Sequence, residues 1–231
     1  MFRRYRTLLA SVTILFLVLG CTLGGLGYLA KCEPEFYTAA ACPNDYDTRE
    51  RASRLLTRVQ DLKNDIRTKT EWGETFTAAE LNCFFAEMLS SGGTFHGLLP
   101  RAAHSPRLAI DGDRLRLGFC YGEGFWSCVV WVEVRAWLVA EETNLMALEV
   151  CDLRAGRLKI GIGTQWVLDA IAETARQSNV DVTWYRYEGR PVGLFRFFPE
   201  QPRPASQVLT LEVRDGAIVV AGRTEGASVG P

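Results

Sequence analysis

The sequence is poor in the residues and motifs that carry enzymatic chemistry. Among its 231 residues there are only two histidines, His96 and His104, in a stretch rich in glycine, proline and arginine. There is no G-x-S-x-G nucleophile motif, and no set of glycines matches a P-loop or a dinucleotide fingerprint. The acids Glu133, Glu149 and Asp152 have no spacing that marks a glycosidase pair. We therefore predict no catalytic residue, no cofactor and no enzymatic activity.

Patterns for metal and nucleic-acid binding are lacking as well. None of the seven cysteines belongs to a C-x-x-C pair, the spacing typical of structural metal sites. The 26 basic residues are balanced by 27 acidic ones, and no basic patch follows the N-terminal arginines. We expect no metal site and no nucleic-acid partner.

What the chain does contain is one long uncharged apolar run, residues 7–30, preceded by Arg3, Arg4 and Arg6. A helix of that length rises about 36 Å, enough to cross a hydrocarbon core of about 30 Å. The positive-inside rule places the N-terminus in the cytoplasm. We predict that residues 1–30 form a signal anchor, a transmembrane helix that holds a single-pass protein in the cell envelope with its main domain extracytoplasmic.

Two alternatives to an uncleaved helix were weighed for this segment. A cleaved signal peptide has an apolar region of about 7–15 residues, shorter than the run seen here. Val18-Leu19-Gly20-Cys21 resembles a bacterial lipobox, in which cleavage precedes lipidation of the Cys21 sulfur. Residues 22–30 stay apolar, however, where a lipoprotein usually turns polar. The retained helix is preferred. The retained helix and a lipidated Cys21 would both tether the domain to the same side of the membrane.

Three further segments are expected after the anchor. Residues 31–46 form a juxtamembrane stalk, in which Phe36 and Tyr37 lie at the headgroup level or pack against the first helix. Residues 47–221 form one extracytoplasmic α+β domain, and residues 222–231 a disordered tail.

The domain begins with helical patterns and continues with strands. An amphipathic helix is predicted over residues 47–68, with Asp47 and Glu50 at its start. A connection over residues 70–75 leads to a second helix, which opens with Thr77 and Glu80 as a capping box.

From residue 106 the apolar period changes from 3.6 to 2, and Asp111-Gly112-Asp113 marks a hairpin turn. The strands on either side of this turn and the strands over residues 126–140 and 145–153 form a predicted meander of four antiparallel strands. A helix over residues 164–177 and hairpins over 180–198 and 208–220 complete the prediction. The predicted fold class is α+β, with an N-terminal transmembrane helix followed by one domain in which a long curved antiparallel sheet packs on amphipathic helices.

The long strand is apolar on both faces, and only Glu133 and Arg135 interrupt the second one. Both faces are therefore covered, or one of them lines an apolar cavity. Core packing is the simpler explanation for the many aromatic residues of the domain. As the alternative, we expect these aromatic residues to line an apolar ligand site: Phe84, Phe85, Trp126, Trp131, Trp137 and Trp166.

An oxidising compartment permits disulfides. Cys120 and Cys128 flank one predicted turn and are candidates for a cross-strand bridge if the loop holds an odd number of residues. An even loop puts them on opposite faces. Cys32 and Cys42 are a second candidate pair, across the stalk.

Two short motifs support a resemblance. Thr77, Glu80, Leu81 and Asn82 form a helix start, and Gly156-Arg157-Leu158 precedes the later helix. In this order they resemble a group of uncharacterised bacterial single-pass membrane-anchored proteins, and the architecture is similar to that of tubular lipid-binding domains. The resemblance implies a curled sheet around a long helix and no catalytic residue. The chain departs from the group after Leu158, where a proline-containing segment is expected.

Two functional hypotheses follow. The preferred one is a membrane-tethered, non-enzymatic module that binds or transfers lipid or another apolar ligand at the cell envelope. The alternative is a structural or scaffolding protein that binds another protein through a sheet edge or through the first helix of the domain.

Overall fold

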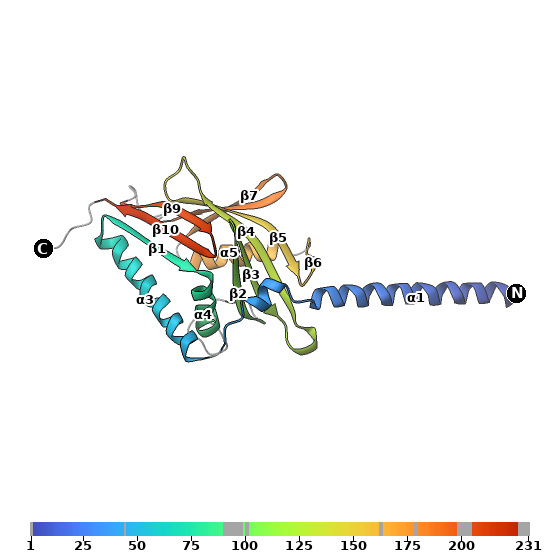
Figure 1. The fold of residues 1–231 in the computed structure, drawn as a ribbon. Helices are drawn as coiled ribbons and strands as arrows, with labels where there is room; N and C mark the ends of the chain where they lie inside the picture. The colour runs from blue at the N-terminus through green and yellow to red at the C-terminus, as the bar shows by residue number, and fades with distance from the viewer. Residues whose placement is uncertain are drawn as a thin grey trace.

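The computed structural model describes residues 2–43, 45–89, 99, 102–161, 164–177, 180–197 and 205–225, with the backbone alone for residues 2–12, 164, 166, 167, 170 and 177. A long N-terminal helix leads into a domain of two antiparallel sheets with helices packed against them (Figure 1). The predicted α+β class, with a large antiparallel sheet and amphipathic helices, is confirmed.

The helix α1 (Phe2–Lys31) projects away from the domain, and the C-terminus lies at the opposite end of the molecule (Figure 1). Its apolar side chains are exposed, with Phe16 68% and Leu23 60% accessible. Among the described residues it is the one helix long and apolar enough to cross a membrane. Exposing so much apolar surface is costly in water, but not in the hydrocarbon core of a membrane.

The short helix α2 (Glu35–Ala39) and the long helix α3 (Tyr46–Thr68) follow. The predicted N-cap of α3 is two residues late, because Asp45 and not Asp47 is the N-cap. The Asp45 carboxylate accepts a hydrogen bond of 2.8 Å from the Thr48 backbone N–H. The helix buries a narrow stripe that includes Ala52 and Leu55.

A three-stranded sheet lies beside α3 in the order β1-β10-β9, formed by β1 (Glu71–Thr77), β9 (Ser206–Arg214) and β10 (Ala217–Thr224). The prediction of a connection over residues 70–75 is wrong, since residues 71–75 belong to β1. Trp72 is buried there and its indole N–H donates to the Thr224 hydroxyl over 3.1 Å. The partner of this strand is about 150 residues away in sequence, so no local pattern announces it.

The predicted tail also begins later than residue 222. β10 continues through Thr224, whose hydroxyl donates to the Ile66 carbonyl over 2.6 Å. Residues 226–231 lie outside the described residues.

The larger sheet has seven strands in the order β2-β3-β4-β5-β8-β7, with β6 also paired to β5. The predicted meander of four strands is confirmed. Their bounds are β2 (Ala103–Asp111), β3 (Arg114–Tyr121), β4 (Cys128–Leu138) and β5 (Leu145–Ala155). The other strands are β6 (Leu158–Lys159), β7 (Asp181–Tyr187) and β8 (Arg190–Arg196).

The main core lies on one face of this sheet. Val132 and Val134 of β4 meet Val150 and Leu153 of β5, and Leu168 of α5 (Thr164–Gln177) covers them. The predicted helix over residues 164–177 is confirmed, and its Leu168 packs on the sheet.

The motif that begins at Thr77 builds the fold. Thr77 and Glu80 form the capping box of α4 (Ala78–Met88), as predicted. The Asn82 carboxamide donates to the Leu108 carbonyl and accepts from the Leu108 N–H, each over 2.7 Å, and so clamps β2 to α4. The helix α3 packs on α4 and the smaller sheet, so the described residues do not form the curled sheet around a long helix that the resemblance implies.

Candidate functional site

The face of β4 opposite the core is only partly covered. Trp131 lies on this face, and the ring of Phe36 from α2 meets it edge-on with 5.5 Å between the ring centroids. Gly118 is directly opposite Trp131 on β3. A Cβ atom at Gly118 would come within 3.0 Å of the Tyr37 ring and 3.3 Å of Phe36, so the glycine makes room for α2.

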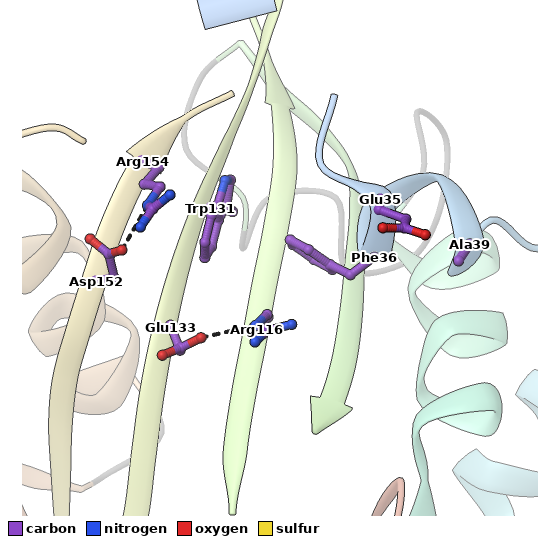
Figure 2. Close-up of a pocket in the computed structure, with 8 residues that line it drawn as sticks. All are labelled: Glu35, Phe36, Ala39, Arg116, Trp131, Glu133, Asp152 and Arg154. Atoms are coloured by element: carbon purple, nitrogen blue, oxygen red, sulfur yellow. Dashed lines mark hydrogen bonds and ion pairs between the residues drawn. The ribbon is translucent and has the colours of Figure 1, made fainter. Parts of the chain in front are cut away.

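A groove of about 570 Å³ opens between α2 and the sheet (Figure 2). The helix α2 supplies one wall of the groove, and it begins four residues after the last residue of α1. Trp131 and Phe36 provide its aromatic surface. The complete lining is Glu35, Phe36, Ala39, Arg116, Trp131, Glu133, Asp152 and Arg154.

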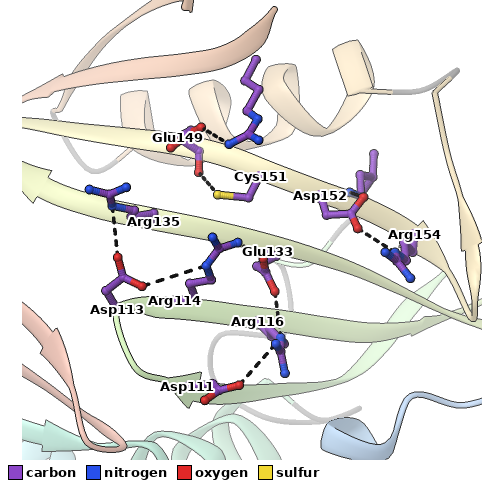
Figure 3. Close-up of polar contacts among 12 residues, drawn as sticks. Asp111, Asp113, Arg114, Arg116, Glu133, Arg135, Glu149, Cys151, Asp152 and Arg154 are labelled. Atoms are coloured by element: carbon purple, nitrogen blue, oxygen red, sulfur yellow. Dashed lines mark hydrogen bonds and ion pairs between the residues drawn. The ribbon is translucent and has the colours of Figure 1, made fainter. Parts of the chain in front are cut away.

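Ion pairs organise the polar part of the groove (Figure 3). Glu133 is 9% exposed and accepts from Arg114 Nη1 at 2.5 Å and from Arg116 Nε at 2.9 Å. Burial alone would raise the pKa of Glu133, but the hydrogen bonds and charges of Arg116 and Arg114 outweigh it and hold that pKa below its usual value. The carboxylate therefore stays charged at neutral pH.

A bulge in β5 determines which acids reach this face. Glu133 pairs with Asp152, whereas the next residue of β4, Val134, pairs with Val150. The extra residue, Cys151, shifts the alternation, so that Glu149 and Asp152 lie on the same face although they are three residues apart. Without the bulge they would lie on opposite faces.

Asp152 is also paired, with Arg154 Nε at 2.7 Å and Lys159 Nζ at 3.4 Å. Glu133 and Asp152 thus form a pair of neighbouring carboxylates, each held by cations. A general acid needs a raised pKa, and that of Glu133 is lowered. The arrangement suits the binding of a polar group better than proton transfer. Glu35 is exposed and has no ion-pair partner among the described residues.

The groove is joined to the apolar helix α1 through the turn after β5. The Arg157 N–H donates to the Leu29 carbonyl at the end of α1 over 3.0 Å. The Gly156 carbonyl accepts from the Trp131 indole N–H over 2.8 Å. Gly156 has φ +56°, and a Cβ atom there would collide with the carbonyl oxygens of Leu29 and Ala30. The Gly156-Arg157-Leu158 motif therefore docks the domain on α1.

The aromatic pair of the stalk packs on the sheet, and neither of its predicted positions is found. Tyr37 is 3% exposed, and its hydroxyl donates to the Ser105 carbonyl over 2.7 Å. Arg107 lies over its ring at 4.2 Å. Burial raises the pKa of Tyr37 to about 12, against the opposing charge of Arg107. The hydroxyl consequently remains a donor that fixes α2 in place.

The structure does not bring together into one site the five predicted ligand-lining aromatics whose side chains it describes. Trp131 lines the groove, whereas Trp137 is 36% exposed beside Arg135. Phe84 and Phe85 belong to α4, away from the groove, and Trp126 is 84% exposed in a turn. The side chain of Trp166 lies outside the described residues.

Sequence reasoning missed the polar lining and the wall from α2. Alternation along β4 places Trp131 and Glu133 on one face, so this part of the signal was present. The arginines and Asp152 join them only through the register of β3, β4 and β5, and a single strand does not reveal that register.

All seven cysteines are free thiols in the structure, so neither candidate bridge is formed. Tyr121 pairs with Cys128, which leaves Cys120 one residue out of step, as expected for an even loop. Instead, the Sγ atoms of Cys42 and Cys83 lie 3.6 Å apart. Burial and the hydrogen bond with Cys83 raise the pKa of Cys42 to about 11. The position of Cys21 on α1 is exposed.

His104, the histidine that the structure describes, is within hydrogen-bond distance of two nearby groups. His104 Nδ1 is 3.2 Å from Ser105 Oγ, and its Nε2 is 3.3 Å from the Gly122 carbonyl. No acid orients the ring, in contrast to a catalytic triad. Within the part of the chain that the structure describes, no group of three His, Cys, Asp or Glu residues could hold a metal ion. His96 lies outside that part.

No family model, no curated protein and no solved structure matches the chain. The groove and the apolar helix are the features on which the main functional proposal rests.

Proposed function

We propose that this protein is a membrane-tethered, non-enzymatic module that binds or transfers a lipid or another largely apolar ligand at the cell envelope. The observation that carries the proposal is the groove between α2 and the sheet, which lies immediately beyond the apolar helix. In this topology the N-terminus is cytoplasmic and the domain is extracytoplasmic, in agreement with the arginines that precede the helix.

The lining of the groove favours an amphipathic ligand. Phe36 and Trp131 offer apolar surface, and the ion pairs of Glu133 and Asp152 border it. A lipid has the same division, with an apolar chain and a polar headgroup. Glu35, which lacks an ion-pair partner among the described residues, would suit a cationic group on such a ligand.

Organic extraction and mass spectrometry of the purified full chain test this proposal. Bulk lipid accompanies any membrane helix, so the wild type must be compared with Phe36→Glu, which places a charge on the wall of the groove. A lipid species that is lost in this variant, and retained in Leu209→Glu, is the groove ligand. Leu209 is a suitable control because it is 57% exposed on β9, away from the groove. Identical lipid profiles in the three proteins would contradict ligand binding.

The topology has a separate test. Protease added to sealed right-side-out vesicles should remove the domain, and inside-out vesicles should protect it. The reverse pattern would place the domain in the cytoplasm.

A second candidate, a scaffold that binds another protein, is favoured by the edge strand β7. It pairs with β8 and with no other described strand, and Tyr185 and Tyr187 are 55% and 67% exposed on it. An exposed edge of this kind can accept a strand of another chain. Capture from solubilised membranes with the full chain should then lose its partner when both tyrosines are replaced by serine. Arg135→Ser, which changes a side chain that is 50% exposed on the interior strand β4, is the control.

A further inference from the structure

Two large aromatic side chains are exposed at the turn between β3 and β4. Phe125 is 75% exposed and Trp126 is 84% exposed, with 5.5 Å between their ring centroids. The turn is held by its own hydrogen bonds, from Trp126 N–H to the Glu123 carbonyl and from Ser127 N–H to the Gly124 carbonyl, each 3.2 Å. The rings are therefore presented by an ordered turn, and adjacent exposed aromatics of this kind mark a contact surface.

The turn lies at the end of the domain from which α1 leaves (Figure 1). Lys31 Nζ, at the last residue of α1, is 3.3 Å from the centroid of the Phe125 ring. Lys31 is also the first charged residue after the apolar run, so it marks the depth at which the helix leaves the hydrocarbon core. Phe125 consequently lies at the depth of the lipid headgroups if α1 spans the membrane.

The same depth carries another exposed aromatic residue and a fixed orientation. Tyr28 of α1 is 72% exposed, three residues before Lys31. The turn at Gly156 and Arg157 docks the domain on the end of α1, so the β3–β4 turn is held beside the helix. Tryptophan and tyrosine are enriched at membrane interfaces, because their rings have an apolar body and a polar group.

We infer that the Phe125–Trp126 turn inserts into the headgroup layer of the membrane that α1 crosses, and is the domain's second membrane contact. It would hold the α2 groove facing the bilayer surface, close to the lipids proposed as ligands. This inference rests on the proposed membrane anchoring and adds a named contact to it. The occupant is lipid and not protein, because the turn lies at the exit of the apolar helix.

Tryptophan quenching in vesicles tests the inference. The full chain is reconstituted in phosphatidylcholine vesicles with or without acyl chains brominated near the headgroup, and the quenched fraction of the emission is measured. In Trp126→Phe we expect this fraction to fall clearly below that of the wild type. Trp137→Phe, the matched control, changes a partly exposed tryptophan near the other end of β4 and should not lower the fraction, because it removes emission that the lipid does not quench.

Three results would overturn the inference. Quenching by brominated lipid that is the same in Trp126→Phe and the wild type places the turn outside the membrane. A blue-shifted Trp126 emission that brominated lipid does not quench indicates a protein partner. If the full chain does not float with vesicles in a density gradient, the membrane anchoring itself fails. Flotation without quenching of Trp126 leaves the anchoring intact and rejects this contact alone. Trp126 is 84% exposed, so Trp126→Phe should leave the fold unchanged. Near-UV circular dichroism of the variant checks this.

Discussion

The two faces of β4 both carry apolar side chains, yet they meet different neighbours. Val132 and Val134 are 7% and 8% exposed in the core that α5 covers. Trp131 and Glu133 point the other way, into the groove beside α2. The first face is closed by apolar packing and the second is held partly open by paired charges.

The difference follows from what each face meets. A helix of 14 residues brings Leu168 onto the core face, whereas a helix of five residues covers only the Trp131 end of the other face. Glu133 then satisfies its charge with arginines from β3. One strand can therefore stabilise the domain and build a site, because its alternating side chains belong to different environments.

The largest expected effect is on the core face. Val134→Ala removes methyl groups from a closed cluster and leaves a cavity, so we expect the free energy of unfolding to fall by about 2 kcal/mol. Urea denaturation of the full chain in detergent, followed by tryptophan fluorescence, measures this change. The neighbouring control Arg135→Ala truncates a side chain that is 50% exposed, and should change stability by less than about 0.5 kcal/mol. Equal losses would contradict the division of β4 into two faces.

A smaller and more local effect is expected at the junction with α1. Gly156→Ala and Gly112→Ala both put a side chain at a positive φ, +56° and +58°, at a cost of roughly 1–2 kcal/mol. Only Gly156→Ala also meets α1, because nothing lies within 4 Å of a Cβ atom at Gly112. Hydrogen exchange should accelerate between α1 and α2 in the first variant and stay slow there in the second. Similar exchange in both would show that the turn does not dock the helix.

Glu133→Gln sharpens the comparison through pH. In the wild type, the pKa of the Glu133 carboxyl is lowered by folding. The carboxylate therefore stabilises the folded protein above the unfolded-state pKa of about 4.3, and this contribution is lost as the pH falls through the folded-state pKa. We expect the wild type to exceed the variant by about 1 kcal/mol at pH 7, since solvent screens the partly exposed arginines. The difference should shrink below about pH 4.3 in urea titrations. A difference that is constant down to pH 3 would disprove the assigned ion pairs.

The smallest effect is expected at the rim of the charged face. Arg190 pairs with Glu149 over 2.8 Å, but its side chain is 57% exposed. Arg190→Ala should therefore leave the urea midpoint nearly unchanged. A loss as large as that of Val134→Ala would mean that the charged face is as closed as the core, a result that the same urea titration detects.

Much of the local structure could be predicted from the sequence. The apolar helix, the capping box at Thr77, the four-stranded meander and the helix over residues 164–177 each have a signal within a few turns or strands. The first strand, β1, escaped because its Gly73 and threonines resemble a loop and its partner is far away in sequence. The sequence analysis put the stalk aromatics at the membrane or against the first helix, because nothing nearby in sequence indicates the pocket that Gly118 leaves for them.

By itself, then, the sequence determined an exposed apolar helix with basic residues before it and an α+β domain after it, since both depend on periodicity and length. The groove was decided by the tertiary structure. Its charges gather on one face through the register of three strands and a bulge at Cys151, and its wall arrives from the stalk. Strand register and helix docking are set by contacts between residues distant in sequence. The free energy of such contacts cannot be predicted from any single segment.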